Sequence, residues 1–375
     1  MERRLTRWTR PVATLWRADA PLTATGLVMV VVLVASLVGV FADPRTITGM
    51  PAWLKPAKFA ASIGIYSLTL AWVFMHLPGW TKTRRLVSWA TAATFLLEEA
   101  IIIAQAWRGT TSHFNVGTPL DMTLWITMGA AIVVQTVTSV AVACALWQQP
   151  FSDRALGWAL RLGLSITILG ASAGGFMTRP TAAQIAEAQI TRRMPVAGAH
   201  TVGAPDGGSG IPGTGWSLEH GDVRVPHFIG LHALQVVPLI ALALSRRRWP
   251  DATRVRLVCI AAASYTALFL ILLWQALRGQ ALICPDATTA AALAAWVALT
   301  ALLARTTHQS IPTRGGRGPE SQGRPRRRFK RRVRGARGEL FQMKLRDFRE
   351  LRVETVSASS SARGAQRGRE IAETI

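Results

Sequence analysis

The sequence predicts an all-α fold: a polytopic transmembrane helix bundle of about eight spans, followed by a disordered basic C-terminal tail. Half of the residues are hydrophobic (50%), yet the formal net charge is +23. Both values arise because long apolar runs hold almost no charge and the arginines lie between and after them, whereas a soluble domain interleaves the two. The chain also has 14 Trp against 2 Tyr, and many of the tryptophans mark the ends of apolar runs, as in an interfacial belt. These are Trp16, Trp53, Trp80, Trp107, Trp147 and Trp249.

Eight apolar runs are long enough to cross a bilayer, since about 20 apolar residues span its hydrocarbon core. The first run exceeds the roughly 7–15 residues of a signal-peptide core, so we expect it to be retained as a span. The fourth is long enough to tilt or to project into the headgroups. The predicted spans are Leu22–Ala42, Ala57–Leu77, Leu86–Trp107, Met122–Trp147, Leu156–Met177, His227–Ser245, Val255–Leu277 and Thr288–Ala304.

Basic residues in the connections predict the orientation. Lys and Arg gather in the N-terminal segment, in the even-numbered connections and in the tail. The positive-inside rule then places both termini in the cytoplasm, which agrees with an even number of spans. The expected location is the inner (plasma) membrane.

Three regions follow from this pattern: a basic cytoplasmic N-terminus at 1–20, a transmembrane bundle at 21–305 and a basic cytoplasmic tail at 306–375. The bundle includes one long outer loop at 178–226, which begins with a helix-forming stretch, Ala182 to Gln189, and then becomes glycine-rich. Such a segment can bind an anion through backbone N–H groups. Because no phosphate-loop frame is present, a flexible surface loop is favoured.

The tail carries 19 Lys or Arg and 7 Asp or Glu from Arg305 onward. Its most basic part, Arg324 to Arg337, cannot bury apolar area and is expected to be disordered. Apolar residues at helical spacing predict a short amphipathic helix at 339–354, bound to anionic lipids of the inner leaflet at about 1 kcal/mol for each nearby basic residue. Nucleic-acid binding is the rival interpretation of arginine-rich sequence. Tethering beside a bilayer favours lipid, so we expect no specific nucleic-acid partner.

Two adjacent carboxylates, Glu98 and Glu99, lie near the middle of the third span and are the strongest indication of a functional site. A charge at the bilayer centre costs roughly 2.5–3.5 kcal/mol on insertion scales, so the pair requires protonation, a cation or a polar cavity. On a regular helix Glu99 points about 100° away from Glu98, so one can face a cavity while the other meets a neighbouring helix.

Polar residues accumulate in the same, outer half of the predicted bundle. Gln105 lies about 20° from Glu98 on the helix and Arg108 about 80° from it, so Gln105 shares its face. Two lysines at the start of the second span either extend to headgroups or neutralise an anionic substrate. We therefore expect an outward-opening pocket. The candidate binding residues are Lys55, Lys58, Gln105, Arg108, His113, Asn115, Asp121 and Gln235.

Histidines at the outer end of the sixth span are candidate metal ligands. His227 and His232 are about 140° apart on a regular helix, so they cannot act as an i, i+4 pair. A metal ion or haem held by these histidines needs a ligand from another span, for which Glu98 or Glu99 is the natural candidate. Packing is the alternative role for His232. Pro238 is expected to kink this span by freeing the carbonyl of Leu234.

Small and thiol-bearing residues make two further predictions. Gly170, Gly174 and Gly175 in the fifth span allow close approach of another helix. The three cysteines show no paired spacing, so neither a disulfide framework nor a zinc knuckle is expected.

Two sequence blocks resemble stretches of uncharacterised multi-spanning bacterial inner-membrane proteins. They are Trp53 to Trp72 (WLKPAKFAASIGIYSLTLAW) and Trp216 to Gln235 (WSLEHGDVRVPHFIGLHALQ). The resemblance covers residues from about 20 to 305, leaves out the tail, and implies a polytopic membrane protein without an assigned activity.

Three functions remain open at this point. The first is a metal- or haem-dependent membrane site with His227, His232 and Glu98 as ligands and with Glu98, Glu99 and His232 as catalytic residues. The second is a proton-coupled transporter of a small solute, in which Glu98 or Glu99 exchanges protons. The third is a non-catalytic assembly or sensor protein. The substrate and the oligomeric state are also open.

Overall fold

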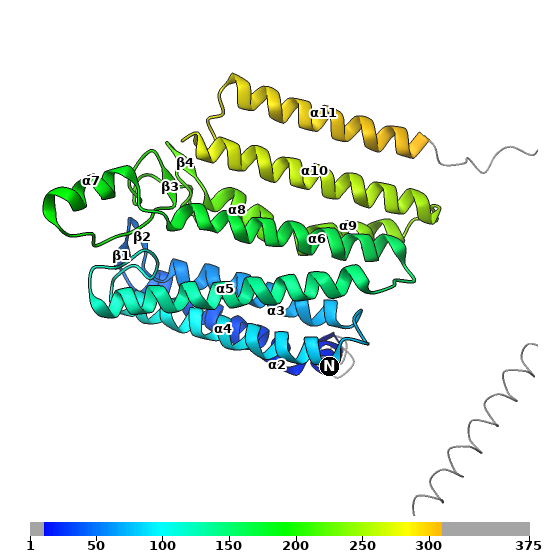
Figure 1. Cartoon of the computed structure of the whole chain (residues 1–375), viewed down its shortest axis with the longest axis horizontal. Coiled ribbons are helices and arrows are strands. Elements are labelled where there is room, and N and C mark those ends of the chain that lie inside the picture. The colour runs from blue at the N-terminus through cyan, green and yellow to red at the C-terminus, as the bar shows by residue number, and fades with distance from the viewer. Residues whose placement is uncertain (1–10, 310–375) are drawn as a thin grey trace, which may run out of the picture. The chain divides into compact units, whose positions relative to one another are not determined.

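The structure is a computed structural model that describes residues 11–309 (Figure 1). The predictions made for the tail, namely its disorder, the amphipathic helix at 339–354 and its binding to anionic lipids, lie outside the described residues.

The described part of the chain is an all-α bundle, as the sequence predicts. Seven helices are long and apolar enough to cross a membrane, and a bent pair of helices brings the number to as many as eight. The spans are α2 (Ala20–Ala42), α3 (Leu54–Phe74), α4 (Thr81–Trp107), α5 (Pro119–Gln148), α6 (Arg154–Ala173), the bent pair α8 (Arg224–Leu231) and α9 (Ala233–Ser245), α10 (Asp251–Leu277) and α11 (Ala287–Gln309).

Several spans begin at a polar side chain that caps the helix. The side chains of Asp19, Thr118 and Asp153 accept hydrogen bonds from backbone N–H groups in the first turns of α2, α5 and α6. Pro21 and Pro119 occupy the first turns of α2 and α5, where a missing N–H costs nothing. The helices therefore start a few residues before the purely apolar runs.

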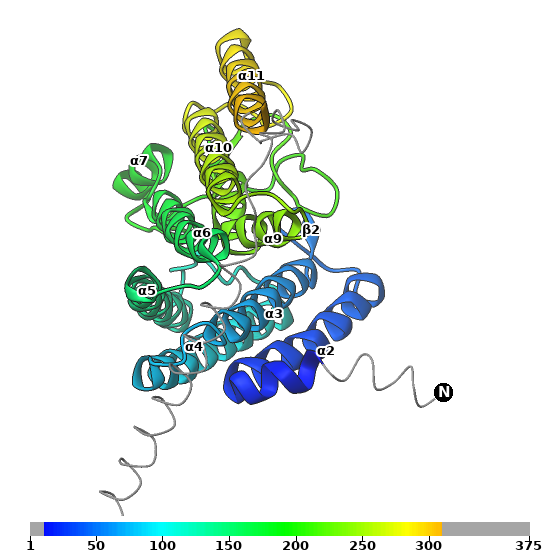
Figure 2. The same cartoon turned by 90° about the vertical axis from the view of Figure 1, so that its right-hand side faces the viewer.

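The core lies where the first four spans meet the last four. Leu70 and Phe74 of α3, Leu146 of α5, Leu164 of α6 and Leu234 of α9 are fully buried in one cluster. Away from this cluster, α2, α5 and α11 expose many large apolar side chains, which is the expected surface of helices embedded in lipid. Figure 2 shows α10 and α11 stacked on one side of α6, with α2 to α4 on the other.

Helix α6 carries a glycine face against which the bent pair packs closely. A Cβ atom at Gly170 would overlap the carbonyl carbon of Gly230, and one at Gly174, the residue directly after α6, would lie 3.1 Å from the ring of His227. A Cβ at Gly163 would similarly meet the carbonyl oxygen of Ala233 at 3.0 Å. The predicted close approach is thus confirmed for Gly170 and Gly174, whereas a Cβ at Gly175 would have no neighbour within 4 Å.

The sixth span is broken at His232 rather than kinked at Pro238. Helices α8 and α9 meet there at 44°, while Pro238 lies inside α9. The predicted kink is therefore misplaced by six residues along the chain.

Side chains from two neighbouring helices satisfy the backbone groups freed at this break. The hydroxyl of Thr167 on α6 donates to the carbonyl of Leu231 (3.2 Å) and accepts from the N–H of Leu234 (3.0 Å). The hydroxyl of Tyr265 on α10 donates to the carbonyl of Ile229 (2.5 Å). Irregular backbone at membrane depth is stable only with such partners, so α6 and α10 determine where the helix breaks.

Four connections gather at one end of the bundle, here called the loop end: residues 43–53, 108–118, 174–223 and 278–286 (Figure 1). The long connection holds the 3-10 turn η1 (Gly174–Thr178) and helix α7 (Ala182–Thr191). Two antiparallel ribbons pair β1 (Thr46–Ile47) with β2 (Met50–Pro51), and β3 (Thr201–Val202) with β4 (Gly221–Asp222). Residues 11 and 309 both lie at the opposite end, as an even number of crossings requires.

Candidate functional site

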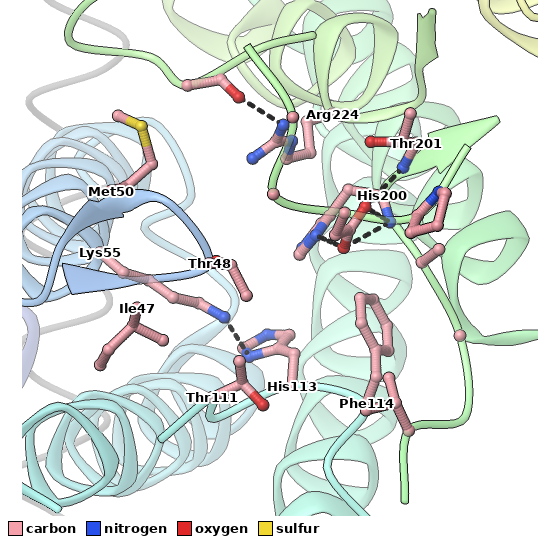
Figure 3. A pocket seen from close by; sticks show the side chains of 18 of the residues that line it. Ile47, Thr48, Met50, Lys55, Thr111, His113, Phe114, His200, Thr201 and Arg224 are labelled. Atoms are coloured by element: carbon pink, nitrogen blue, oxygen red, sulfur yellow. Dashed lines mark hydrogen bonds and ion pairs between the residues drawn. The ribbon is translucent and has the colours of Figure 1, made fainter. Parts of the chain in front are cut away.

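The loop end encloses a cavity of about 1030 Å³. Its walls come from the start of α3, the connection between α4 and α5, and the long connection at 178–223 (Figure 3). The glycine-rich part of that connection, which the sequence predicts to be a flexible surface loop, lines the cavity. Gly203, Gly207 and Gly215 adopt positive φ angles there, which a side chain would strain.

Two lysines from the first turns of α3 line the cavity. Lys55 Nζ lies 3.0 Å from Nδ1 of His113, and Lys58 Nζ donates to the carbonyl of Thr214 at 2.8 Å. Within residues 11–309 neither ammonium group lies within ion-pair distance of a carboxylate. The start of α3 also has no side-chain cap. Two lysines without a carboxylate partner, beside a helix N-terminus, favour an anion in this part of the cavity, because an anion would stabilise their charged form.

His113 connects the cavity with the interior of the bundle. Its ring is packed against Phe59 and Trp125, and its Nε2 lies 3.9 Å from Oε1 of Glu98. An ammonium group can only donate, so Nδ1 accepts from Lys55 and the ring proton lies on Nε2, toward Glu98. Burial, and then the charge of Lys55, lower the pKa of His113 well below its ordinary value, so the imidazole is neutral at pH 7.

The two glutamates of α4 are buried, with 3% of Glu98 and 1% of Glu99 exposed. Oε2 of Glu98 and both carboxylate oxygens of Glu99 have no hydrogen-bond partner among the described residues. Two adjacent, buried and largely unpartnered carboxylates cannot both stay ionised cheaply, so the pair is suited to holding a proton. Lys55, His113 and Glu98 thus form a line from the cavity to these carboxylates.

Four other predicted binding residues form a separate network that closes the α4–α5 connection. Gln105 donates to Oδ1 of Asp121 (2.8 Å), and Arg108 forms an ion pair with the same oxygen (2.6 Å). Asn115 donates to the hydroxyl of Thr110 (2.9 Å). The polar groups of Gln105, Arg108 and Asp121 bind one another, and none of the three residues lines the cavity.

The candidate residues of the sixth span lie in packing environments. His227 donates through Nδ1 to the carbonyl of Gly170 (2.7 Å). The ring of His232 packs against Phe228 with centroids 4.3 Å apart, and Gln235 donates to the hydroxyl of Thr69 (3.3 Å). Across residues 11–309 no group of three or more His, Cys, Asp or Glu side chains is placed to hold a metal ion. The geometry therefore gives no support to a metal or haem held by His227, His232 and Glu98.

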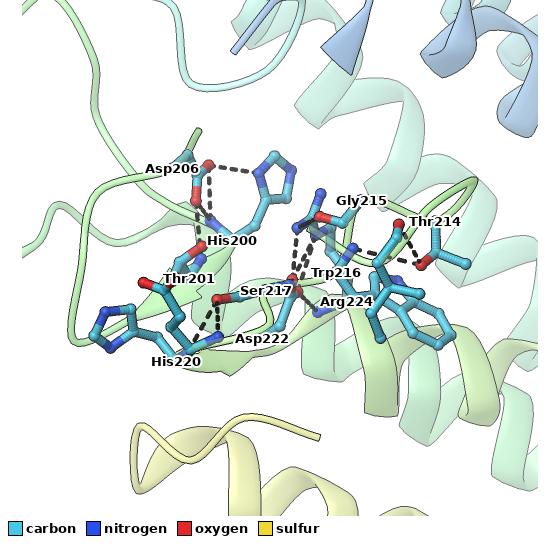
Figure 4. A network of polar contacts seen from close by, with 12 residues as sticks. His200, Thr201, Asp206, Thr214, Gly215, Trp216, Ser217, His220, Asp222 and Arg224 are labelled. Carbon is cyan, nitrogen blue, oxygen red and sulfur yellow. Dashed lines mark hydrogen bonds and ion pairs between the residues drawn. The ribbon is translucent and has the colours of Figure 1, made fainter. Parts of the chain in front are cut away.

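A histidine–aspartate pair that the sequence did not reveal lines the same cavity. His200 Nδ1 lies 2.6 Å from Oδ2 of Asp206 (Figure 4). The same oxygen accepts a hydrogen bond from the backbone N–H of His200, and Oδ1 of Asp206 accepts one from the backbone N–H of Thr201. Burial lowers the pKa of His200 although Asp206 raises it. Burial raises the pKa of Asp206, but these hydrogen bonds and the charge of His200 hold it below its ordinary value.

Arg224 is a further residue that the sequence did not reveal. It forms a two-pronged ion pair with the buried carboxylate of Asp222 and donates to the carbonyl of Gly215. Because Arg224 begins α8, this network fixes the long connection to the bundle. Neither residue follows a helical or strand period, so only the folded arrangement reveals the network.

No protein-family model, curated protein or solved structure matches this chain. The geometry supports a multi-span membrane protein.

Proposed function

We propose that this protein is a proton-coupled carrier of a small anionic solute, which binds in the cavity at the loop end. The observation that carries this proposal is the line from Lys55 through His113 to Glu98, which connects a cationic cavity to a buried carboxylate pair.

The cavity suits an anion of modest size. Small-molecule sites typically measure about 300–1,000 Å³, and this one has about 1030 Å³. Lys55, Lys58 and Arg224 line it. Glu187, Asp206 and Glu219 also line it. Asp206 is already occupied by His200 and backbone N–H groups, and Arg224 is paired with Asp222, so Lys55 and Lys58 are the cations that remain for a solute.

Coupling to protons follows from electrostatics. The amine of Lys55 faces Glu98 across the ring of His113, so a positive charge there attracts the ionised carboxylate. An anion bound at Lys55 offsets this charge, and protonation of the buried carboxylate pair then becomes more favourable. By linkage, protonation of Glu98 strengthens anion binding by the same factor. Solute and proton are thus expected to move in the same direction.

The broken span is also in keeping with a carrier. Transporters frequently build their sites from discontinuous helices, and here the short half α8 begins with Arg224 at the cavity. The start of α8 therefore provides a helix N-terminus and Arg224 beside the proposed solute, while the break at His232 lies at the other end of this short helix.

For its location, we infer that the protein lies in the inner (plasma) membrane with the loop end outside and both termini in the cytoplasm. This inference rests on the distribution of Lys and Arg in the connections.

The test uses the full chain in liposomes that contain a pH-sensitive dye. Inorganic phosphate, succinate and citrate are added outside in turn, and internal acidification is followed. We expect at least one anion to stimulate proton entry. Glu98→Gln should abolish this stimulation, because the amide cannot exchange a proton.

Glu187→Gln is the matched control, because Glu187 is exposed on α7 at the edge of the same cavity. It should leave proton entry unchanged. Anion-stimulated acidification that persists in Glu98→Gln, or its absence with every anion in the wild type, would contradict the proposal.

A further inference from the structure

A second cavity, of about 350 Å³, lies at the opposite end of the bundle. The starts of α2 and α4 form it, and three arginines line it: Arg17, Arg84 and Arg85. Two tryptophans, Trp16 and Trp89, complete its edge, and both are largely exposed.

The charge of this cavity is only partly compensated from within, because one carboxylate lies among three arginines. Asp19 is the acidic residue among those that line it, and its carboxylate already accepts from the N–H of Leu22 and from the hydroxyl of Ser88. None of the three arginines forms an ion pair with another described residue.

Arg84 is held in place for binding. Its Nη2 donates to the carbonyl of Ala18 (2.6 Å) and its guanidinium lies over the ring of Phe74, while its buried Nε has no partner among residues 11–309. The N-termini of α2 and α4 add partial positive charge. A guanidinium cluster of this kind is suited to a phosphate group, which it binds through several charge-assisted hydrogen bonds.

The position of the cavity along the membrane normal indicates which molecule would supply a phosphate group. Helices α2 and α4 become apolar directly after it, and Leu86 beside it is 72% exposed. Exposed indole rings at such a boundary mark the headgroup layer of a bilayer. A ligand with a phosphate here can extend its acyl chains along the exposed apolar surface of α2 and α4, which free phosphate cannot do.

We propose that the cavity formed by Arg17, Arg84 and Arg85 is a binding site for the headgroup phosphate of an anionic phospholipid. The site is independent of the carrier function, because it lies at the other end of the bundle and shares no lining residue with the first cavity.

The test measures lipid binding to the purified full chain by native mass spectrometry, with dioleoyl phosphatidylglycerol and dioleoyl phosphatidylcholine. We expect phosphatidylglycerol to bind more tightly. The double variant Arg17→Gln/Arg85→Gln should weaken its binding about tenfold or more, since charge-assisted hydrogen bonds are lost. Arg84 is left intact because it also supports the fold.

The matched control is Lys82→Gln/Arg154→Gln, which removes the same charge from exposed positions at the same end that do not line the cavity. It should retain phosphatidylglycerol. An equal loss in both double variants would reduce the effect to general surface attraction, and equal affinity for the two lipids would also overturn the proposal. Displacement of the lipid by inorganic phosphate alone would show that the site takes a free anion instead.

Discussion

Individual buried side chains, rather than a sequence motif, define the site at the loop end. Glu98 and Glu99 were predicted as the most informative pair, and the structure buries both with unpartnered oxygens. His113 joins them to Lys55 because its two ring nitrogens face different elements. In the proposed carrier, the imidazole of His113 therefore links the cavity to the carboxylates.

The burial of His113 predicts a pH dependence of stability. Its pKa is lower in the folded protein than the ordinary 6.5, so below about pH 6.5 the unfolded chain binds more protons and the folded state loses stability. Thermal denaturation of the purified protein between pH 5 and 8 should show this loss on the acid side. His113→Gln should have a shallower acid dependence, and part of it should remain because His200 shifts in the same direction.

His220→Gln is the comparison for that measurement, since His220 lines the same cavity from the long connection. Its acid dependence should stay steeper than that of His113→Gln. If His113→Gln and His220→Gln flatten the curve equally, the acid sensitivity does not arise at His113.

The sequence could identify the glutamates but not the partners of His113. A charge inside an apolar run is visible by its cost, so Glu98 and Glu99 were predicted from residue type alone. A loop histidine is more often solvated, and nothing in its spacing indicates that Phe59 and Trp125 enclose it. His200 and Asp206 were missed because positive-φ glycines fold an apparently flexible segment over the cavity.

Among the helices, the break in the sixth span depends most on its neighbours. Thr167 on α6 both donates to the carbonyl of Leu231 and accepts from the N–H of Leu234. Thr167→Val keeps the shape but leaves both backbone groups unpaired in a buried position. The expected loss is about 1–3 kcal/mol of stability, seen as a lower melting temperature in detergent.

Thr123→Val serves as the control for this change. Thr123 is exposed on α5, and its hydroxyl donates to the carbonyl of Pro119 in its own helix. The substitution should leave the melting temperature almost unchanged. A melting temperature of Thr167→Val no lower than that of Thr123→Val would show that the break does not need this hydroxyl.

The boundaries of helices could be predicted from the sequence where neighbouring residues determine them, but not where distant residues do. The ends of the apolar runs and the caps at Asp19, Thr118 and Asp153 lie within the sequence itself. The position of the break at His232 could not be predicted, because Thr167 and Tyr265 supply its hydrogen-bond partners from distant parts of the chain. Pro238 predicted a kink, but the tertiary contacts break the span at His232 instead.

The bundle as a whole places residues 11 and 309 at one end and four connections at the other. Cys284 is exposed in the connection at 278–286, at the loop end. If the loop end is outside, a membrane-impermeant maleimide added to intact cells should label Cys284, and Cys284→Ser should lose that label. Labelling that appears only after cell lysis would reverse the predicted orientation.

The glycine face of α6 has a mechanical consequence. Gly163 meets α9 and Gly170 meets α8, so both halves of the broken span rest on one neighbour and the three helices form a stiff block. Lys55 and His113 belong to the other half of the bundle, whereas His200 and Arg224 are anchored to this block. If one half of the bundle rocks against the other, the two walls of the cavity therefore separate. The distance between Lys55 and Arg224 measures this opening.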